Sequence, residues 1–286
     1  MNTNNNLYTV IYTTVIVVVV AALLAFVSQS LKSRQEANEK AETISQMLAA
    51  ARYDFKSELD KMSNSQKLDM YAAEIERAFL IDLEGNEVRD LDISRDNIEV
   101  FSPKELKRIN YNIKGGANAT GEAQLPVFWF RNGSVVVPIY GAGLWGPIWG
   151  YISFDGGTPT ICGAYFDHES ETAGLGAKIK DDLSFQLQFE GEQADFTQAN
   201  VFEIVKGGAP KEADGKSVVD NKIDAITGAT MTSQGLDAAI DTWLAAYAPY
   251  FGNSVISSED NSVISSEDNS VISSEVEKSN EEEVVL

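Results

Sequence analysis

The chain starts with an apolar run that carries no charged side chain. Residues 7–27 are uncharged over 21 positions and end in the stretch VIVVVVAALLAFV. At about 1.5 Å per residue, a helix of this length covers roughly 30 Å, the thickness of the hydrocarbon core of a bilayer. Tyr8 and Tyr12 would then lie near one interface, where aromatic side chains are enriched. The sequence therefore predicts a transmembrane anchor over residues 1–31.

A cleaved signal peptide is the alternative for this run. It is the weaker interpretation, because no Lys or Arg precedes the run and because the apolar stretch is long for a signal peptide. Lys32, Arg34 and Lys40 follow the span, whereas only the α-amino group precedes it. By the positive-inside rule, these charges place the C-terminal part of the chain in the cytoplasm.

Composition limits the chemistry of the remaining chain. The 286 residues include one cysteine, Cys162, and one histidine, His168, which excludes an internal disulfide and any cysteine-rich zinc or iron–sulfur site held by this chain alone. The formal charge of -21 argues against nucleic acid as a partner. We expect no metal site and no catalytic side chain, so that demanding chemistry would fall to a cofactor.

The pattern of apolar residues indicates an α+β fold with helices at both ends. Residues 35–55 read as a helix that continues from the anchor, with Ile44, Met47, Leu48 and Ala51 at helical spacing. The Asn-Gly pair at 132–133 predicts a hairpin between two apolar runs. The expected strands cover residues 77–83, 127–130, 135–139, 148–154, 160–166, 185–189 and 202–205. Residues 32–125 would form a helical connector and the N-terminal part of the soluble domain.

The C-terminal segment, residues 253–286, repeats the octad NSVISSED twice and then degenerately. Nine acidic residues and one lysine give this segment eight of the 21 excess negative charges. One Val-Ile pair per copy offers too little apolar surface to offset the entropy of ordering. We predict a disordered acidic tail; a docking peptide is the less favoured alternative.

The most informative stretch is DAITGATMTS at residues 224–233, directly before an amphipathic helix. An apolar stripe at helical spacing follows it, made of Leu236, Ala239, Ile240, Trp243, Leu244 and Tyr247. Thr232 or Ser233 is a plausible N-cap, which puts Thr230 on a small-residue turn at the positive end of a helix. Such a turn is typical of a phosphate site, although threonines here can also serve only as caps.

Thr227-Gly228-Ala229-Thr230 resembles the [ST]-G-A-T motif of membrane-associated subunits that bind FMN covalently. In those subunits the FMN phosphate is joined to the second threonine as a phosphodiester, which implies attachment at Thr230 and an FMN-binding domain over residues 126–252. The segment GLWGPIWGY at 143–151 and the Tyr8–Tyr12 pair are similar to the covalent-FMN subunit of the sodium-translocating NADH:quinone reductase. The corresponding subunit of the Rnf ferredoxin–NAD complex shares the motif.

Residues 171–176, ETAGLG, match a second family segment that usually reads ETPGLG, so that Ala173 departs from the pattern. Taken alone, a Gly-rich loop is more often a simple turn, a Trp in an apolar run is more often core, and a lone Lys is as often solvated. With the resemblance, we expect the FMN-binding residues to be Thr230, Thr227, Gly228, Ala229, Trp145, Glu171, Thr172, Gly174, Leu175 and Lys206.

The resemblance implies a single-pass flavoprotein subunit that carries electrons within a sodium-pumping NADH:ubiquinone reductase. Its partners would be the other members of a six-subunit reductase and a flavin transferase that uses FAD. The family places the soluble domain on the periplasmic side of the bacterial inner membrane, against the local charges, and we follow the family. The alternatives are the flavin subunit of an Rnf-type complex and a membrane-anchored scaffold without redox chemistry, in which Thr230 only caps a helix.

Overall fold

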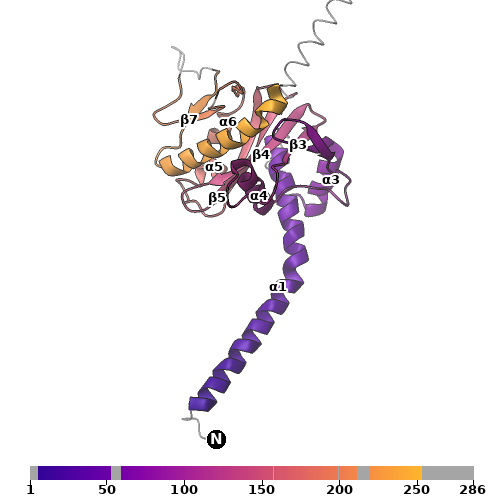
Figure 1. Cartoon of the computed structure of the whole chain (residues 1–286), viewed down its shortest axis with the longest axis vertical. Coiled ribbons are helices and arrows are strands. Elements are labelled where there is room, and N and C mark those ends of the chain that lie inside the picture. Colours follow the sequence, from indigo (N-terminus) through magenta and orange to yellow (C-terminus); the bar gives the residue numbers. More distant parts are fainter. Residues whose placement is uncertain (1–5, 53–58, 157, 199, 211–218, 253–286) are drawn as a thin grey trace, which may run out of the picture.

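A single long helix joins the apolar N-terminal run to the folded domain. The computed structural model describes residues 6–52, 59–156, 158–198, 200–210 and 219–252. Helix α1 (Asn6–Ala50) projects far from the domain, as Figure 1 shows, and its side chains are exposed over residues 9–39. It is long and apolar enough to cross a membrane. This confirms the predicted apolar helix ahead of a mixed α and β domain.

The last three turns of α1 belong to the domain core. Ile44, Met47, Leu48 and Ala51 are completely buried. The helix predicted over residues 35–55 is therefore confirmed through Ala50, and residues 53–58 lie outside the described part of the chain. One unbroken helix is thus exposed at its apolar end and buried at its other end, so continuous helical backbone joins the apolar segment to the domain.

Six antiparallel strands form the central sheet, in the order β2-β1-β3-β4-β5-β6. The strands are β1 (Ile75–Ile81), β2 (Glu87–Asp90), β3 (Leu125–Phe130), β4 (Ser134–Ala142), β5 (Pro147–Asp155) and β6 (Ile161–His168). The predicted hairpin joins β3 to β4, and Gly133 has a φ of +86°, which favours glycine. The predicted strands at 77–83, 127–130, 135–139, 148–154 and 160–166 are confirmed, with ends shifted by a few residues.

Both faces of the sheet are covered by helices. Along β4, Val135 and Val137 face one hydrophobic cluster, whereas Val136 faces the other, as the alternation of strand side chains requires. The first cluster lies under α4 (Pro103–Lys114) and the C-terminal helix, residues 230–252; the second lies under α1 and α3 (Asn64–Glu74). The result is a three-layer α/β/α domain (Figure 1).

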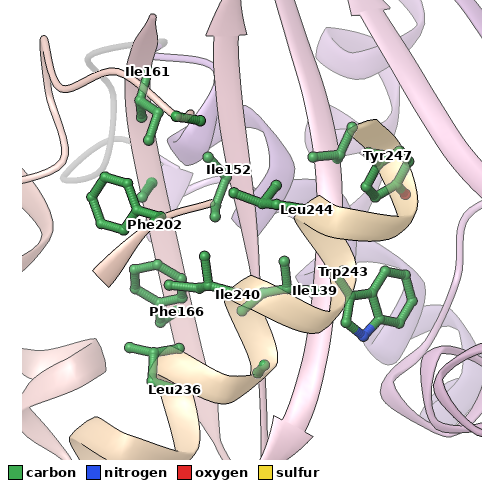
Figure 2. Packing of buried hydrophobic residues seen from close by; sticks show 14 of the residues in the cluster. Ile139, Ile152, Ile161, Phe166, Phe202, Leu236, Ile240, Trp243, Leu244 and Tyr247 are labelled. Atoms are coloured by element: carbon green, nitrogen blue, oxygen red, sulfur yellow. The ribbon is translucent and has the colours of Figure 1, made fainter. Parts of the chain in front are cut away.

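The C-terminal helix packs through the stripe predicted from the sequence. Leu236, Ile240, Trp243, Leu244 and Tyr247 are fully buried against the sheet, as Figure 2 shows. The indole Nε1 of Trp243 donates to the backbone oxygen of Tyr140 at 2.9 Å and to Asn110 Oδ1 at 3.1 Å. These bonds and the apolar contacts fix the helix over the sheet, with its first turn beside the loop between β4 and β5.

One predicted strand is wrong. Residues 183–187 form the short helix α6 (Leu183–Leu187), which follows α5 (Lys178–Asp181), where a strand was expected over 185–189. The Asp182 side chain accepts from Ser184 N at 3.0 Å and caps α6, and Phe185 and Phe189, four residues apart, both pack near Phe166. Four-residue spacing suits one face of a helical segment, and this signal outweighs the β propensity of the two phenylalanines.

Two helices of the connector, α3 and α4, lacked a sequence prediction. Each starts with a capping box: Ser63 with Gln66 in α3, and Ser102 with Glu105 in α4, where Pro103 occupies the first turn. A serine followed three residues later by Glu or Gln is a recognisable helix start. The signal was present in the sequence, and the structure shows that both boxes are formed.

A separate two-stranded parallel sheet lies directly before the TGAT motif in the chain. β7 (Glu203–Val205), predicted as 202–205, pairs with β8 (Lys222–Asp224). The C-terminal helix holds β7 through two carboxylates: Asp237 Oδ1 accepts from Ile204 N at 2.6 Å, and Asp241 Oδ1 accepts from Phe202 N at 3.3 Å. Because the pairing is parallel, both strands end on the same side, and β8 is followed by the turn that leads to Thr230.

This contact predicts a pH dependence of stability. Burial raises the pKa of Asp241 to about 6, with a further contribution from the charges of Asp237 and Glu203, while the amide of Phe202 opposes the rise. The folded state therefore keeps a proton that the unfolded state releases between about pH 4 and 6, so that stability falls as the pH rises through this window. Lys222 pairs with Glu203, one of the two carboxylates that raise this pKa.

Asp241→Asn keeps an oxygen that can accept from Phe202 and removes the charge. We expect it to stabilise the domain at pH 7 by about 1 kcal/mol, a value reduced for partial exposure, and to flatten the pH profile between about pH 4 and 7. Thermal unfolding at several pH values measures both effects. Asp155→Asn, at an exposed position, is the matched control. Parallel pH profiles for the wild type and Asp241→Asn would contradict the assignment.

Candidate functional site

The TGAT motif forms the tight connection between β8 and the C-terminal helix. Gly228 has a φ of +83°, in the left-handed region that only glycine adopts readily. Ala229 N donates to Ile226 O at 3.1 Å and closes the turn, and Thr230 is the first helical residue and is half-buried. Thr227 is exposed. Thr230 therefore stands where unpaired amides and the helix dipole favour an anion.

The predicted N-caps at Thr232 and Ser233 are wrong, because the helix starts earlier, at Thr230. Both side chains lie in its first turn and are buried. Ser233 Oγ accepts from Ile226 N at 3.1 Å and thereby holds the residues that precede the turn. Thr232 Oγ1 donates to Glu171 Oε2 at 2.7 Å, which ties the helix start to a second loop. Neither side chain competes with Thr230 for the exposed end of the helix.

The ETAGLG loop lies directly against the motif. Thr172 O accepts from Leu175 N and from Ala177 N, each at 3.1 Å, and Gly174 has a φ of +74°, so this segment is a tight turn leading into α5. Leu175 remains 43% exposed, and a Cβ added to Gly228 would lie 3.2 Å from Leu175 Cδ2. Leu175 and Gly228 are therefore neighbours at the surface, whereas Thr172 and Gly174 form the exposed rim of the loop.

Trp145 lies on the loop between β4 and β5, which folds over the start of the C-terminal helix. Gly143 N donates to Gly146 O at 2.8 Å and closes this loop, and a Cβ on Gly235 would lie 3.3 Å from Gly143 Cα. The Trp145 side chain is 65% exposed, so it is not part of the core. An exposed indole on this loop offers apolar surface to a flat ring system.

Glu171 differs from the other predicted site residues because its carboxylate faces inward. The residue is 8% exposed. Its Oε1 accepts from the backbone N of Trp145 at 3.0 Å and its Oε2 accepts from Thr232, while its own backbone N donates to His168 Nδ1 at 3.1 Å. The structure thus brings together the loops at 143–146 and 171–176 and the helix start through one buried side chain.

Lys206 reaches the same end of the domain through the parallel pairing of β7 with β8. It directly follows β7, and Val205 is in register with Asp224, whose neighbour Ala225 donates its backbone N to Val205 O at 3.0 Å. The exposed Lys206 therefore lies level with the residues that lead into the TGAT turn. A cation placed there suits a phosphate or an anionic ring.

The chemistry of this surface fits FMN. It combines helix-start amides and a lysine for a phosphate with exposed apolar side chains for an aromatic ring, and it leaves the Thr230 hydroxyl near the anion-binding position. Met231, which was not among the predicted site residues, is 58% exposed at the start of the same helix. Among the described residues, no group of three or more His, Cys, Asp or Glu side chains could hold a metal ion. The arrangement favours cofactor binding over hydrolytic or metal chemistry.

Known proteins resemble this chain both in the motif region and in the whole domain. The FMN-binding domain family matches residues 143–245. The NqrC subunit of the Na(+)-translocating NADH-quinone reductase from Chlamydia muridarum is 32% identical over 139 residues, covering 44% of this chain and 43% of the relative. The same subunit from Vibrio campbellii is 29% identical over 123 residues, covering 41% and 44%. The matches thus span less than half the length of these curated relatives.

Solved structures match over a larger share. The crystal structure of the NqrC subunit from Parabacteroides distasonis has a TM-score of 0.56 and 28% identity, and the match covers 77% of this chain and 96% of that chain. The Shewanella oneidensis NqrC structure gives a TM-score of 0.56 and 27% identity, covering 77% and 99%. These matches confirm the resemblance and the mixed α and β fold expected from the motifs.

Proposed function

We propose that this chain, similar in sequence and fold to the NqrC subunit of the sodium-translocating NADH:quinone reductase, is the membrane-anchored flavoprotein subunit of such a complex. It carries electrons through FMN joined by its phosphate to Thr230. The observation that supports this proposal most directly is the position of Thr230. Thr230 is the first residue of the C-terminal helix, after a turn that Gly228 makes possible. Exposed Leu175 neighbours Gly228, and Glu171 ties the loop of Trp145 to Thr232.

The protein residues divide the work of holding FMN. Thr230 would form the ester, and the amides of Gly228 and of the first helical turn would stabilise the phosphate charge, whereas the Ala229 amide is already bonded to Ile226 O. Trp145 and Leu175 would offer apolar surface to the ring, and the exposed rim of the second loop, at Thr172 and Gly174, would line the same site. Lys206 balances negative charge on the phosphate or on the reduced ring. When bound, FMN supplies the one-electron chemistry that no side chain of this chain offers.

A covalent bond to the cofactor suits a domain that moves between electron donor and acceptor, because dissociation cannot then limit the number of turnovers. The other members of the six-subunit reductase would contact α1 within the inner membrane. A flavin transferase would move FMN from FAD to the Thr230 hydroxyl: the pyrophosphate bond of FAD breaks, the phosphodiester to Thr230 forms, and AMP leaves with the hydroxyl proton. We place the folded domain and this attachment step on the periplasmic side.

The periplasmic placement is testable with an impermeant thiol reagent. Asn118→Cys introduces a thiol at an exposed loop position, in a Cys162→Ser background. We expect this thiol to react in intact spheroplasts, because the reagent reaches only periplasmic groups. Cys162→Ser alone is the control for background labelling. Reaction only after lysis would show that the domain is cytoplasmic, which is the placement that the positive-inside rule predicts from Lys32 and Arg34.

Peptide mass spectrometry across residues 223–234 tests the proposed cofactor directly. The protein is produced with and without a flavin transferase, and fragmentation locates the added mass. We expect the added mass of one FMN, joined through its phosphate to Thr230, only when the transferase is present. An unmodified peptide in both samples would refute covalent attachment and favour a scaffold without redox chemistry. Neighbouring genes that encode iron–sulfur subunits specific to the Rnf complex would instead favour the Rnf-type complex.

A further inference from the structure

We propose that Glu171 is a positioning residue: its buried carboxylate holds the Trp145 loop and the first turn of the C-terminal helix in the arrangement that receives the flavin ring. This role rests on the proposed function and goes beyond it, because it assigns Glu171 to the support of the site and not to contact with FMN. The proposal starts from the two acceptor bonds that the carboxylate makes to different segments.

Each oxygen of the carboxylate accepts from one segment. Oε1 accepts from Trp145 N at 3.0 Å, and Oε2 accepts from Thr232 Oγ1 at 2.7 Å. The two donors are 87 positions apart in the chain, and Thr232 is two residues after Thr230. A carboxylate is the side chain suited to this task, since it accepts at both oxygens and donates at neither, and bonds to an ionised acceptor are the stronger ones.

The packing around the carboxylate indicates a site built to hold it. Gly143 and Gly176 lie against its two oxygens, and a Cβ at either position would overlap with Glu171. At Gly176 the same Cβ would also come within 2.6 Å of Thr232 Oγ1. The last glycine of the ETAGLG loop thus leaves room for the bond between Glu171 and Thr232, although its φ lies outside the left-handed region.

The exposure of Trp145 explains why such support is needed. An indole that is 65% exposed lacks the close packing that fixes core side chains, so its position depends on its backbone. The loop carrying it is closed by a backbone bond from Gly143 to Gly146, and two side chains anchor Trp145: Glu171 accepts from its N, and Ser170 Oγ donates to its O at 2.8 Å. Because His168 Nδ1 in turn accepts from Glu171 N at 3.1 Å, the support extends to the end of β6.

We call the two bonds from Glu171 to Trp145 N and Thr232 Oγ1 the clamp. The first test measures how strongly the clamp protects the Trp145 amide from exchange, in protein that carries no flavin. Hydrogen exchange at residues 143–146 is followed in the full-length chain produced without transferase. Glu171→Gln keeps an acceptor for the Trp145 amide but removes its charge, and the weaker bond is expected to accelerate exchange at that amide about tenfold. Glu84→Gln, an exposed carboxylate on the turn between β1 and β2, is the matched control and should exchange like the wild type. Unchanged exchange in Glu171→Gln would overturn the proposal.

The second test measures the flavin in the transferase-modified chain, by iodide quenching of its fluorescence and by its midpoint potential. We expect Glu171→Gln to keep FMN on Thr230, to increase quenching and to raise the potential, because a buried negative charge near the ring is lost. Thr232→Val should increase quenching with less change in potential, whereas Thr232→Ser keeps the hydroxyl and should restore wild-type quenching. The double variant Glu171→Gln with Thr232→Val should not exceed Glu171→Gln, because both changes break one clamp.

The outcomes separate this proposal from the proposed function. Faster exchange with unchanged quenching and potential would refute the positioning role while leaving the proposed flavoprotein function intact. Failure of the wild type to take up FMN would overturn the proposed function, and with it the flavin role of Glu171, although the exchange experiment would still report on the clamp. Faster exchange together with a more accessible flavin of altered potential is the result we expect.

Discussion

Thr230→Ala is expected to abolish flavin attachment completely. The variant lacks the hydroxyl that would form the phosphodiester. The other hydroxyls of the first turn are buried and already bonded, Thr232 to Glu171 and Ser233 to the Ile226 amide. The denatured band should lose its fluorescence under ultraviolet light, and the intact mass should equal that of the unmodified chain. Helix propensity favours alanine at this position, so the fold should be retained.

Thr227→Ser is the matched control for this experiment. It alters the first threonine of the same turn, which is exposed, to a residue that the [ST]-G-A-T motif accepts. We expect its flavin content to equal that of the wild type. A flavinylated Thr230→Ala chain would show that the attachment residue lies elsewhere, and the fragment spectra would identify it. Equal melting temperatures for the two variants would exclude unfolding as the cause of the loss.

Trp243→Ala is expected to have the largest effect on stability. The indole is completely buried where the C-terminal helix crosses the sheet, and its removal leaves both a cavity and two acceptors, Tyr140 O and Asn110 Oδ1, without their donor. Replacing a buried Trp by Ala costs about 3–5 kcal/mol. That is a large share of the roughly 5–15 kcal/mol by which domains are stable. Chemical denaturation of the full-length chain in detergent measures the difference.

Two further variants separate packing from hydrogen bonding at this position. Trp243→Phe keeps an aromatic ring and removes the donor, so we expect a smaller loss than for alanine. Gln234→Ala changes an exposed residue of the same helix and should alter stability by no more than about 0.5 kcal/mol. A loss of less than about 1 kcal/mol in Trp243→Ala would contradict the packing shown in Figure 2.

Much of the fold could be predicted because its signals are local. The stripe from Leu236 to Tyr247 repeats at helical spacing, and the Asn-Gly pair at 132–133 specifies a hairpin, and the structure has both. The strand expected at 185–189 is wrong because two phenylalanines four residues apart suit either structure, and Asp182 starts a helix before them. Helices α3 and α4 were missed although capping boxes mark both starts.

The predicted site residues differ in exposure and in the direction of their side chains. Leu175 lies exposed against Gly228 of the motif, exposed Trp145 is tied to Thr232 through Glu171, and parallel strand pairing brings Lys206 to the same end of the domain. Glu171 faces inward, toward donors from Trp145 and Thr232. Its sequence position beside exposed Thr172 gives no sign of this direction, since the direction depends on loops distant in the chain. The predicted limits of the anchor, connector, FMN-binding domain and tail stay predictions, and residues 253–286 lie outside the described part.

The amino-acid sequence by itself determined the apolar helix, the α+β class and the threonine motif before the last helix, because each depends on neighbours within a few turns or strands. The tertiary structure decided which residues meet. It placed Trp145, the ETAGLG loop and Thr230 on one surface and turned Glu171 into its support. Contacts of this kind join segments tens of residues apart, and they form only when the sheet has set the helix and the loops in register.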